Sequence, residues 1–457
     1  MLEGPILLGV LLLGILFIVF TTSKFKLHPF LALIFAAYLI AFSVKMPLNQ
    51  IGATINAGFG GTLTGIGIVI IAGTIIGTIL EKSGAAITMA ETILKYVGKK
   101  RPALAMNLIG FIVSIPVFCD SGYVILSSLN KSLAKRTKNS LVVMSVALAT
   151  GLFATHTLVP PTPGPIAAAE QLGIVDNLLI VILFGLLCAI PATLAGYFYA
   201  VKFCNKYKIA NEESEIDQSE SLEVAATIEH SFEKLPSPLL AFSPIVLPII
   251  LLTLGSIANL PMAPFGEGTL KTILAFLGVP VNALIIGVLS SFALLPNFKE
   301  ETLTGWIGEG VKGAAVIIMI TGAGGALGQV LRATPITAYL GETLSNLNIG
   351  IFVPFIIAAA LKTAQGSSTV ALVTTAAIIA PIIEPLGLTT TIAKALTVMS
   401  IGAGAMTVSH ANDSYFWVVA QFSGMDVKTA YKTQTVATLL QGLVTISVVW
   451  VLSLILI

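Results

Sequence analysis

Cys119-Asp120-Ser121-Gly122 interrupts an apolar stretch that runs from about residue 103 to 130. A second apolar stretch, 351–383, is interrupted in the same way by Gln365-Gly366-Ser367-Ser368-Thr369. An uninterrupted stretch of this length would cross the hydrocarbon core of a membrane, which takes about 20 apolar residues. A polar cluster in the middle instead predicts two shorter helices that meet at a polar tip. We therefore expect each stretch to form a re-entrant hairpin that enters and leaves on one side of the membrane.

The composition of the whole chain is that of a membrane protein. Of 457 residues, 56% are hydrophobic and only 10% are charged, whereas a soluble domain carries about 25% charged residues. The net charge of +2 gives no electrostatic footprint for a nucleic acid. Three cysteines are too few for a disulfide framework or a thiolate metal site, and no phosphate-binding P-loop occurs. We expect an all-α polytopic membrane protein without metal, cofactor or nucleic-acid partner.

Ten further apolar runs predict membrane helices on either side of one polar segment. They fall near 5–20, 28–44, 57–80, 141–159, 178–201, 243–260, 272–295, 314–331, 392–408 and 433–457. The polar segment, 205–237, carries eight acidic residues and few aromatic ones, which is typical of a solvated linker. The chain therefore divides into a first half, 1–204, a linker, 205–237, and a second half, 238–457.

The two halves resemble each other along much of their length. The sequence AGTIIGTIL at 72–80 matches AGGALGQVL at 323–331, and Thr155-His156 matches Ser409-His410. The offsets between matching positions, 251 and 254, are nearly constant. With its hairpin returning to the side it came from, each half crosses the membrane five times. An odd number of crossings predicts two inverted repeats, the arrangement of many secondary transporters.

The distribution of basic residues predicts the orientation. If the N-terminus lies outside, 19 of the 24 Lys and Arg residues fall on the inner side, as the positive-inside rule requires. The linker is then cytoplasmic and both termini lie outside.

Four helix breaks at membrane depth form the candidate substrate site. They are the two hairpin tips, 119–123 and 365–369, and the interruptions at 155–165 and 409–414. Each offers N-cap residue types or a Pro/Gly pair ahead of a new helix, so four positively polarised helix N-termini would face one region, which suits an anion. The candidate binding residues are Asp120, Ser121, Gly122, His156, Thr162, Gly164, Lys362, Gln365, Ser367, Ser368, Thr369, His410, Asn412 and Asp413.

The charged candidates each have two interpretations. Asp120 and Asp413 are either helix caps or the carboxylates that carry a coupled proton, because an acidic residue inside a membrane is otherwise costly. His156 and His410, at repeat-equivalent positions, either exchange protons or pack as neutral rings. Lys362 is either the partner of a substrate carboxylate or the counter-charge of Asp413.

Three motifs carry a resemblance to a known family. They are Pro116-Val117-Phe118-Cys119-Asp120-Ser121-Gly122, His156 with Pro160-Pro161-Thr162-Pro163-Gly164-Pro165, and Asn412-Asp413-Ser414 with Phe416-Trp417. With them the chain resembles, over essentially its whole length, the gluconate permease family of bacterial proton symporters in the ion-transporter superfamily.

The resemblance implies a function and a mechanism. It implies a non-enzymatic secondary transporter of the bacterial inner membrane that takes up a sugar acid or another small hydroxycarboxylate with protons. It also implies a scaffold that forms a homodimer and a mobile domain that carries both hairpins, in an elevator-type motion. A sodium-coupled carboxylate transporter is the alternative. A channel is disfavoured because the breaks form one cluster rather than a polar stripe, and an enzyme because no nucleophile–base pair is visible.

Overall fold

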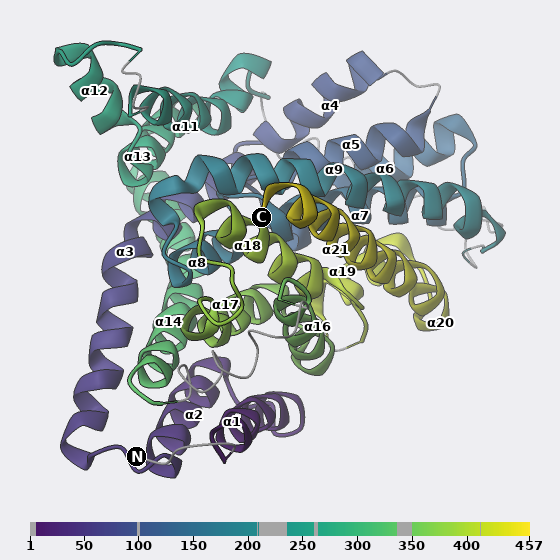
Figure 1. Ribbon diagram of the computed structural model, residues 1–457. Coiled ribbons are helices and arrows are strands. Elements are labelled where there is room, and N and C mark those ends of the chain that lie inside the picture. Colours follow the sequence, from purple (N-terminus) through teal and green to yellow (C-terminus); the bar gives the residue numbers. More distant parts are fainter. Residues whose placement is uncertain are drawn as a thin grey trace.

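The computed structural model describes residues 6–97, 101–207, 209, 235–259, 264–335, 350–411 and 413–457. Every regular element in these ranges is a helix (Figure 1), so the predicted all-helical fold is confirmed. Most of the predicted acidic linker, residue 208 and residues 210–234, lies outside the described residues.

The described part of the first half contains nine α-helices. They are α1 (Ile6–Ser23), α2 (Pro29–Ser43), α3 (Leu48–Lys82), α4 (Ala85–Val97), α5 (Pro102–Val113), α6 (Cys119–Thr137), α7 (Leu141–Leu158), α8 (Pro163–Gln171) and α9 (Leu178–Phe203). In the described part of the second half the helices are α11 (Pro238–Ala258), α12 (Thr269–Leu277), α13 (Pro280–Ser291), α14 (Ile307–Arg332), α16 (Phe352–Gln365), α17 (Ser368–Ile379), α18 (Thr391–Met406), α19 (Ser414–Ser423), α20 (Val427–Ala430) and α21 (Val436–Leu456).

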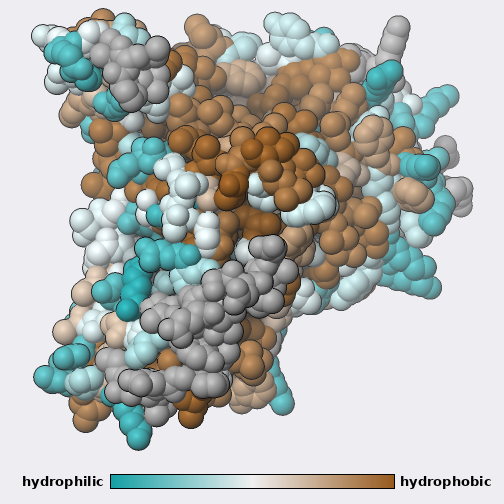
Figure 2. All heavy atoms as spheres, viewed as in Figure 1, coloured by the Kyte–Doolittle hydropathy of each residue, from teal (hydrophilic) through white to brown (hydrophobic). Residues whose placement is uncertain are grey.

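The helices have the length and surface that a membrane requires. Within the described residues, five helical segments are long and apolar enough to cross a membrane, or up to seven if each of two bent pairs counts as one span. Large apolar side chains on α9, among them Leu183, Ile190 and Phe198, are exposed. Figure 2 shows the broad apolar area to which this region belongs. An apolar exposed face of this extent fits contact with lipid.

Both predicted hairpins are present. The first consists of α5 and α6, which meet at 114–118, and the second of α16 and α17, which meet at Gly366 and Ser367. The entering helices, α5 and α16, have 12 and 14 residues. They are about 18 and 21 Å long, shorter than the roughly 30 Å hydrocarbon core, so neither crosses it alone.

The predicted span at 272–295 is bent. The apolar run at 272–295 was expected to be a single helix, but α12 and α13 meet at an angle of 73°. Pro280 is the first residue of α13, and a proline disfavours helical backbone in the residue before it. Gly278, which ends α12, packs against Gly255 of α11, where an added Cβ would lie 2.4 Å from the Gly255 Cα. The close contact between these glycines holds the bend in place.

Equivalent helices of the two halves make equivalent contacts. α2 packs on α14 and α13 packs on α3, while α6 packs on α19 and α17 packs on α8. α3 and α14 themselves run antiparallel, because Gly310 faces Ile75 whereas Gly325 faces Gly58. Figure 1 shows α1 and α2 at one end of this pair of helices and α11 to α13 at the other. Since α3 and α14 are repeat-equivalent, their antiparallel packing is that of two inverted repeats.

The inverted arrangement predicts the accessibility of the two hairpin bases. A cysteine introduced by Lys131→Cys, near the base of the first hairpin, should react with a membrane-impermeant maleimide only from the cytoplasm. A cysteine introduced by Gly350→Cys, at the base of the second, should react only from outside. Labelling intact cells and inside-out vesicles measures both. Reaction of both cysteines from the same side would contradict the inverted topology.

Small residues let the central helices approach closely. An added Cβ at Gly151 of α7 would lie 2.0 Å from the Asn107 carbonyl oxygen of α5, and one at Gly110 would lie 2.6 Å from the Leu148 carbonyl oxygen. Backbone atoms cannot yield as a flexible side chain can, so α5 and α7 can pack at this distance only with glycine at both positions.

Gly151→Ala should therefore lower the free energy of unfolding by about 1–3 kcal/mol, the usual cost of overpacking. Gly52→Ala in α3 is the matched control, because nothing lies within 4 Å of an added Cβ there. Thermal unfolding of the purified protein in detergent measures both variants. Equal melting temperatures for the two variants would show that α5 and α7 are not packed through Gly151.

Candidate functional site

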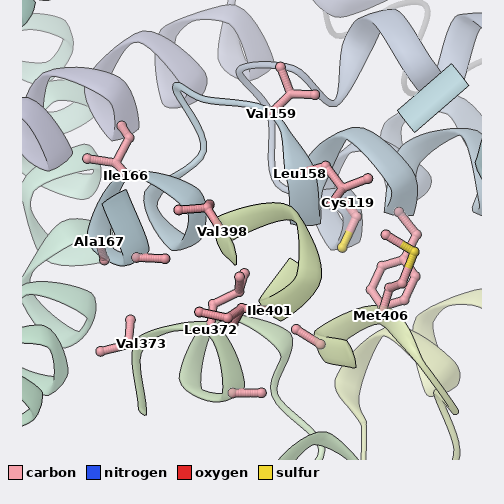
Figure 3. Packing of buried hydrophobic residues seen from close by; sticks show 14 of the residues in the cluster. Cys119, Leu158, Val159, Ile166, Ala167, Leu372, Val373, Val398, Ile401 and Met406 are labelled. Carbon is pink, nitrogen blue, oxygen red and sulfur yellow. The ribbon is translucent and has the colours of Figure 1, made fainter. Parts of the chain in front are cut away.

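The helix breaks meet around the buried middle of α7 and α18. All residues of α7 from Val142 to Leu158 are buried, as are those of α18 from Ala395 to Met406. Figure 3 shows the apolar packing beside the breaks, formed by Leu372 and Val373 of α17, Ile166 and Ala167 of α8, and Val398 and Ile401 of α18, with Cys119 near Leu158. α17 packs on α8 and α18, and α19 packs on α6 and α7, so the helices that begin at the breaks contact one another in pairs around α7 and α18.

Lys362 and Asp413 form an ion pair at this point. The Lys362 Nζ lies 2.6 Å from the Asp413 Oδ2, and the two side chains are 0% and 5% exposed. Lys362 Nζ also donates to the carbonyl oxygen of Gly366 at the second tip, and it lies 5.5 Å from the centroid of the Phe153 ring. The ammonium thus contacts a carboxylate, a carbonyl oxygen and an aromatic ring, and these three contacts offset the cost of burying its charge.

Asp413 is held from several sides. Ser409 Oγ donates to its Oδ2 over 2.5 Å, and its Oδ1 accepts a hydrogen bond from the Tyr415 backbone N–H at the start of α19. The Tyr415 hydroxyl donates to the carbonyl oxygen of Ala149 in α7, and its ring stacks on Phe153 with centroids 5.1 Å apart. The ion pair therefore joins the second hairpin, the last break and α7. Two roles were considered for Lys362, and in this structure it is the counter-charge of Asp413.

Asp120 lies in the first turn of α6, and only one of its two carboxylate oxygens has a hydrogen-bond partner in the described structure. Its Oδ2 is 3.7 Å from the Cys119 Sγ, and the hydroxyl of Ser414 lies within hydrogen-bonding reach of the carboxylate. Its Oδ1 is buried and has no partner in the described structure. Lys362 and Asp413 are both within electrostatic range, but Lys362 is engaged by Asp413. Within the described residues, Asp120 therefore forms no ion pair of its own.

The two repeat-equivalent histidines have different surroundings. His156 is 7% exposed, packs against Phe118 with ring centroids 5.7 Å apart, and has a buried Nδ1 without a partner in the described residues. His410 is half-buried, and its Nε2 is 2.9 Å from the carbonyl oxygen of Thr363 in α16. The Nδ1 of His156 is thus buried without a partner in the described residues, whereas His410 links the last break to the second hairpin.

Two of the four expected helix caps are present. Ser367 accepts from the Val370 N–H at the start of α17, and Asp413 accepts from the Tyr415 N–H at the start of α19. The N-cap residues of α6 and α8, Phe118 and Thr162, make no side-chain cap. The expectation of cap chemistry at every break was therefore wrong for these two helices. Phe118 has no acceptor, and Thr162 donates its hydroxyl to the Val159 carbonyl oxygen instead.

The remaining candidates divide into packing residues and residues near the tips. Gly122 and Gly164 are packing positions, since an added Cβ would lie 2.8 Å from Leu152 and 2.6 Å from Leu372 respectively. Ser121 lies within hydrogen-bonding reach of Glu81 at the end of α3, and Ser368 and Thr369 begin α17. The side chain of Gln365 and the whole of Asn412 lie outside the described residues.

Four residues of this cluster are not among the predicted binding residues: Phe153, Glu81, Ser409 and Tyr415. Phe153 stands three residues before His156, on the same face of a helix, which is a signal that periodicity could have used. Ser409 is the first residue of the last break, and Tyr415 directly follows it. No local pattern points to Glu81, because only the folding of α3 against the first tip brings it to Ser121.

The fold and this site define a polytopic membrane permease rather than an enzyme. The family model of the GntP family permeases matches residues 6–455, and the chain belongs to this family. Family membership makes it a multi-pass membrane permease.

Two relatives and one solved structure illustrate the range of the similarity. A gluconate permease of Pseudomonas aeruginosa is 33% identical, with 97% of each chain covered. The D-serine transporter DsdX of Escherichia coli O6:H1 is also 33% identical, again with 97% of each chain covered. The crystal structure of the Alcanivorax borkumensis YdaH transporter has a TM-score of 0.62 at 14% identity, and the match covers 94% of this chain and 98% of that one. The similarity to the YdaH transporter is a similarity of fold.

Proposed function

We propose that this permease takes up a sugar acid or a small hydroxycarboxylate together with protons. The substrate carboxylate would bind at the uncapped N-terminus of α6, whose first-turn N–H groups and positive dipole end favour an anion. The unpartnered Nδ1 of His156 and the hydroxyl of Ser121 would contact substrate hydroxyl groups. Hydroxylated acids such as the substrates named for the relatives, gluconate and D-serine, carry both kinds of group.

The observation that carries this proposal is the pairing of Lys362 with Asp413. Because this ion pair is internally neutral, the carboxylates of the cluster that remain outside it are Asp120, in the first turn of α6, and Glu81, beside Ser121. A substrate anion that approaches an ionised Asp120 is repelled, since like charges in a poorly solvated site disfavour each other strongly. Protonation of Asp120 removes the repulsion. Anion and proton would therefore bind together, and one proton would make the uptake of a monoanion electrically neutral.

The same pair supports protons over sodium as the coupling ion. A sodium ion at the second tip would need oxygen ligands such as the Gly366 carbonyl and a nearby carboxylate. In this chain the Lys362 ammonium contacts both of these oxygens. A second cation in that place would be repelled by the first.

We further propose that the hairpin-bearing helices move as one body against α3 and α14, in an elevator-type motion with both termini outside. The chain is proposed to work as a homodimer. Figure 1 shows α3 and α14 along one edge of the molecule, with the hairpins and α18 to their side.

Uptake into proteoliposomes tests the function. Radiolabelled gluconate and D-serine are offered with an inward proton gradient at several external sodium concentrations. We expect accumulation of a hydroxylated carboxylate that an uncoupler abolishes and that sodium does not change. Accumulation that follows the sodium gradient and ignores the uncoupler would support the sodium-coupled alternative.

A further inference from the structure

One face of α3 runs along the helix breaks of the first half and ends at a carboxylate. An added Cβ would lie 2.9 Å from a backbone carbonyl oxygen at Gly73 and 2.6 Å from another at Gly77, and both oxygens belong to these breaks. Glu81 is the next residue of this row, since positions four apart share one face of a helix. Its carboxylate lies within hydrogen-bonding reach of Ser121. The close packing of α3 on the breaks therefore brings Glu81 to the first tip.

The position of Glu81 is unfavourable for a negative charge. Glu81 is the second-last residue of α3, and the C-terminal end of a helix dipole disfavours a carboxylate. The neighbouring ammonium of Lys82 pairs with Glu309 of α14 over 2.7 Å, and Glu309 adds a second negative charge within electrostatic range of Glu81. Within the described residues Glu81 itself forms no ion pair. A neutral residue would fit this helix end at a lower cost, so stability does not explain the carboxylate.

Glu81 lies between a buried carboxylate and an exposed surface. The Oδ1 of Asp120, the neighbour of Ser121, is buried, whereas Glu81 is half-buried. Next to Glu81, the side chains of Lys82 and Glu309 are 31% and 54% exposed. The distribution of basic residues predicts that this end of α3 is cytoplasmic. Glu81 is thus a titratable group on the way from the first tip to the cytoplasmic surface.

The equivalent positions of the second half offer no such group. Arg332 of α14 stands where Glu81 stands in α3, at an offset of 251. Val370 is the third residue of α17, as Ser121 is of α6. A guanidinium keeps its proton at any physiological pH and cannot accept another. The carboxylate therefore accompanies only the first tip, which is the tip that carries Asp120.

We propose that Glu81 accepts the coupled proton from Asp120 and releases it to the cytoplasm. The inference rests on the proposed function, in which Asp120 carries the proton together with the substrate. After the substrate leaves, water in the site passes the proton from the Asp120 carboxyl group to the Glu81 carboxylate. Asp120 is then ionised and Glu81 is neutral. Glu81 gives the proton to cytoplasmic water and becomes ionised again, so the site is ready for the next cycle.

Three variants in proteoliposomes test this role. Glu81→Gln keeps the size of the side chain but cannot take a proton, whereas Glu81→Asp keeps a carboxylate. Glu91→Gln is the matched control, because it removes an exposed carboxylate from α4, the helix that follows α3. Net uptake of radiolabelled gluconate or D-serine under an inward proton gradient requires release of the proton inside. Counterflow does not, since the proton can return with the exchanged substrate.

Glu81→Gln should slow net uptake about tenfold or more, because a positioned proton-transfer group usually contributes at least that much to a rate. Counterflow and the melting temperature in detergent should stay at the level of the parent chain. The final accumulation ratio should be unchanged but reached later, because Asp120 still couples the proton to the substrate. Glu81→Asp should recover part of the rate, and Glu91→Gln should match the parent.

Net uptake by Glu81→Gln at the parent rate would overturn the inference. A loss of counterflow as large as the loss of net uptake would also overturn it, because Glu81 would then act on substrate binding or on folding. So would a Glu81→Asp variant as slow as Glu81→Gln, because the rate would then not depend on the carboxylate. Failure of the proposed proton coupling shows separately, as uptake by the parent chain that an uncoupler does not inhibit.

Discussion

Lys362→Ala should lower the free energy of unfolding by about 3–5 kcal/mol, the usual cost of removing one partner from a buried ion pair. Asp413 would keep Ser409 and the Tyr415 N–H as hydrogen-bond donors, but its charge would be left without a cation at 5% side-chain exposure. Thermal unfolding in detergent measures the loss. Lys82→Ala is the matched control: its partner Glu309 is more than half exposed, and an exposed pair contributes about 0–1 kcal/mol.

A double substitution separates the charge from the packing. Lys362→Met with Asp413→Asn removes both charges, keeps the volume of the long side chain, and keeps an N-cap acceptor for α19, because Asn caps as well as Asp does. The double variant should recover a large part of the stability that Lys362→Ala loses. A double variant no more stable than Lys362→Ala would show that Lys362 acts mainly on something other than Asp413, with the substrate carboxylate as the remaining candidate.

Asp120→Asn should abolish proton-driven accumulation and leave binding and exchange largely intact. The amide keeps the size and hydrogen-bonding shape of the carboxyl group but cannot carry a proton. A pH difference of one unit supports up to about tenfold accumulation of a monoanion that enters with one proton, and the variant should only equilibrate its substrate. Counterflow of labelled for unlabelled substrate measures exchange, and uptake under a pH gradient measures accumulation.

Ser121→Ala is the control for the Asp120 variant, because it changes the neighbouring tip residue and removes no titratable group. We expect it to weaken apparent affinity modestly while the accumulation ratio stays as in the parent chain. Uphill accumulation by Asp120→Asn equal to that of the parent would leave Asp120 with a structural role in the first turn of α6.

The fold could be predicted from the sequence because it depends on local patterns that occur in both halves of the chain. A polar cluster within an apolar stretch specified each hairpin, and the near-constant offset between 72–80 and 323–331 specified the repeat. The bend at Gly278 was missed, since hydropathy alone cannot distinguish one long helix from two that meet at a glycine contact.

The site was less predictable because its decisive contacts join distant segments. Lys362 and Asp413 are 51 residues apart, and the sequence could only offer Asp413 as one of two partners. The cap at α8 was expected from the residue type, but the Thr162 hydroxyl donates to the Val159 carbonyl oxygen instead. Phe153, which covers the Lys362 ammonium, resembles any other aromatic residue of an apolar helix until the hairpin is folded against it.

The proton flux that accompanies substrate entry is the most direct measure of whether this permease couples uptake to protons. Proteoliposomes that contain a pH-sensitive dye are placed in sodium-free buffer, and gluconate or D-serine is added outside. We expect the interior to acidify at a rate that matches substrate uptake, and not to acidify with Asp120→Asn. Substrate uptake without any change of internal pH, or uptake that begins only when sodium is supplied, would contradict it.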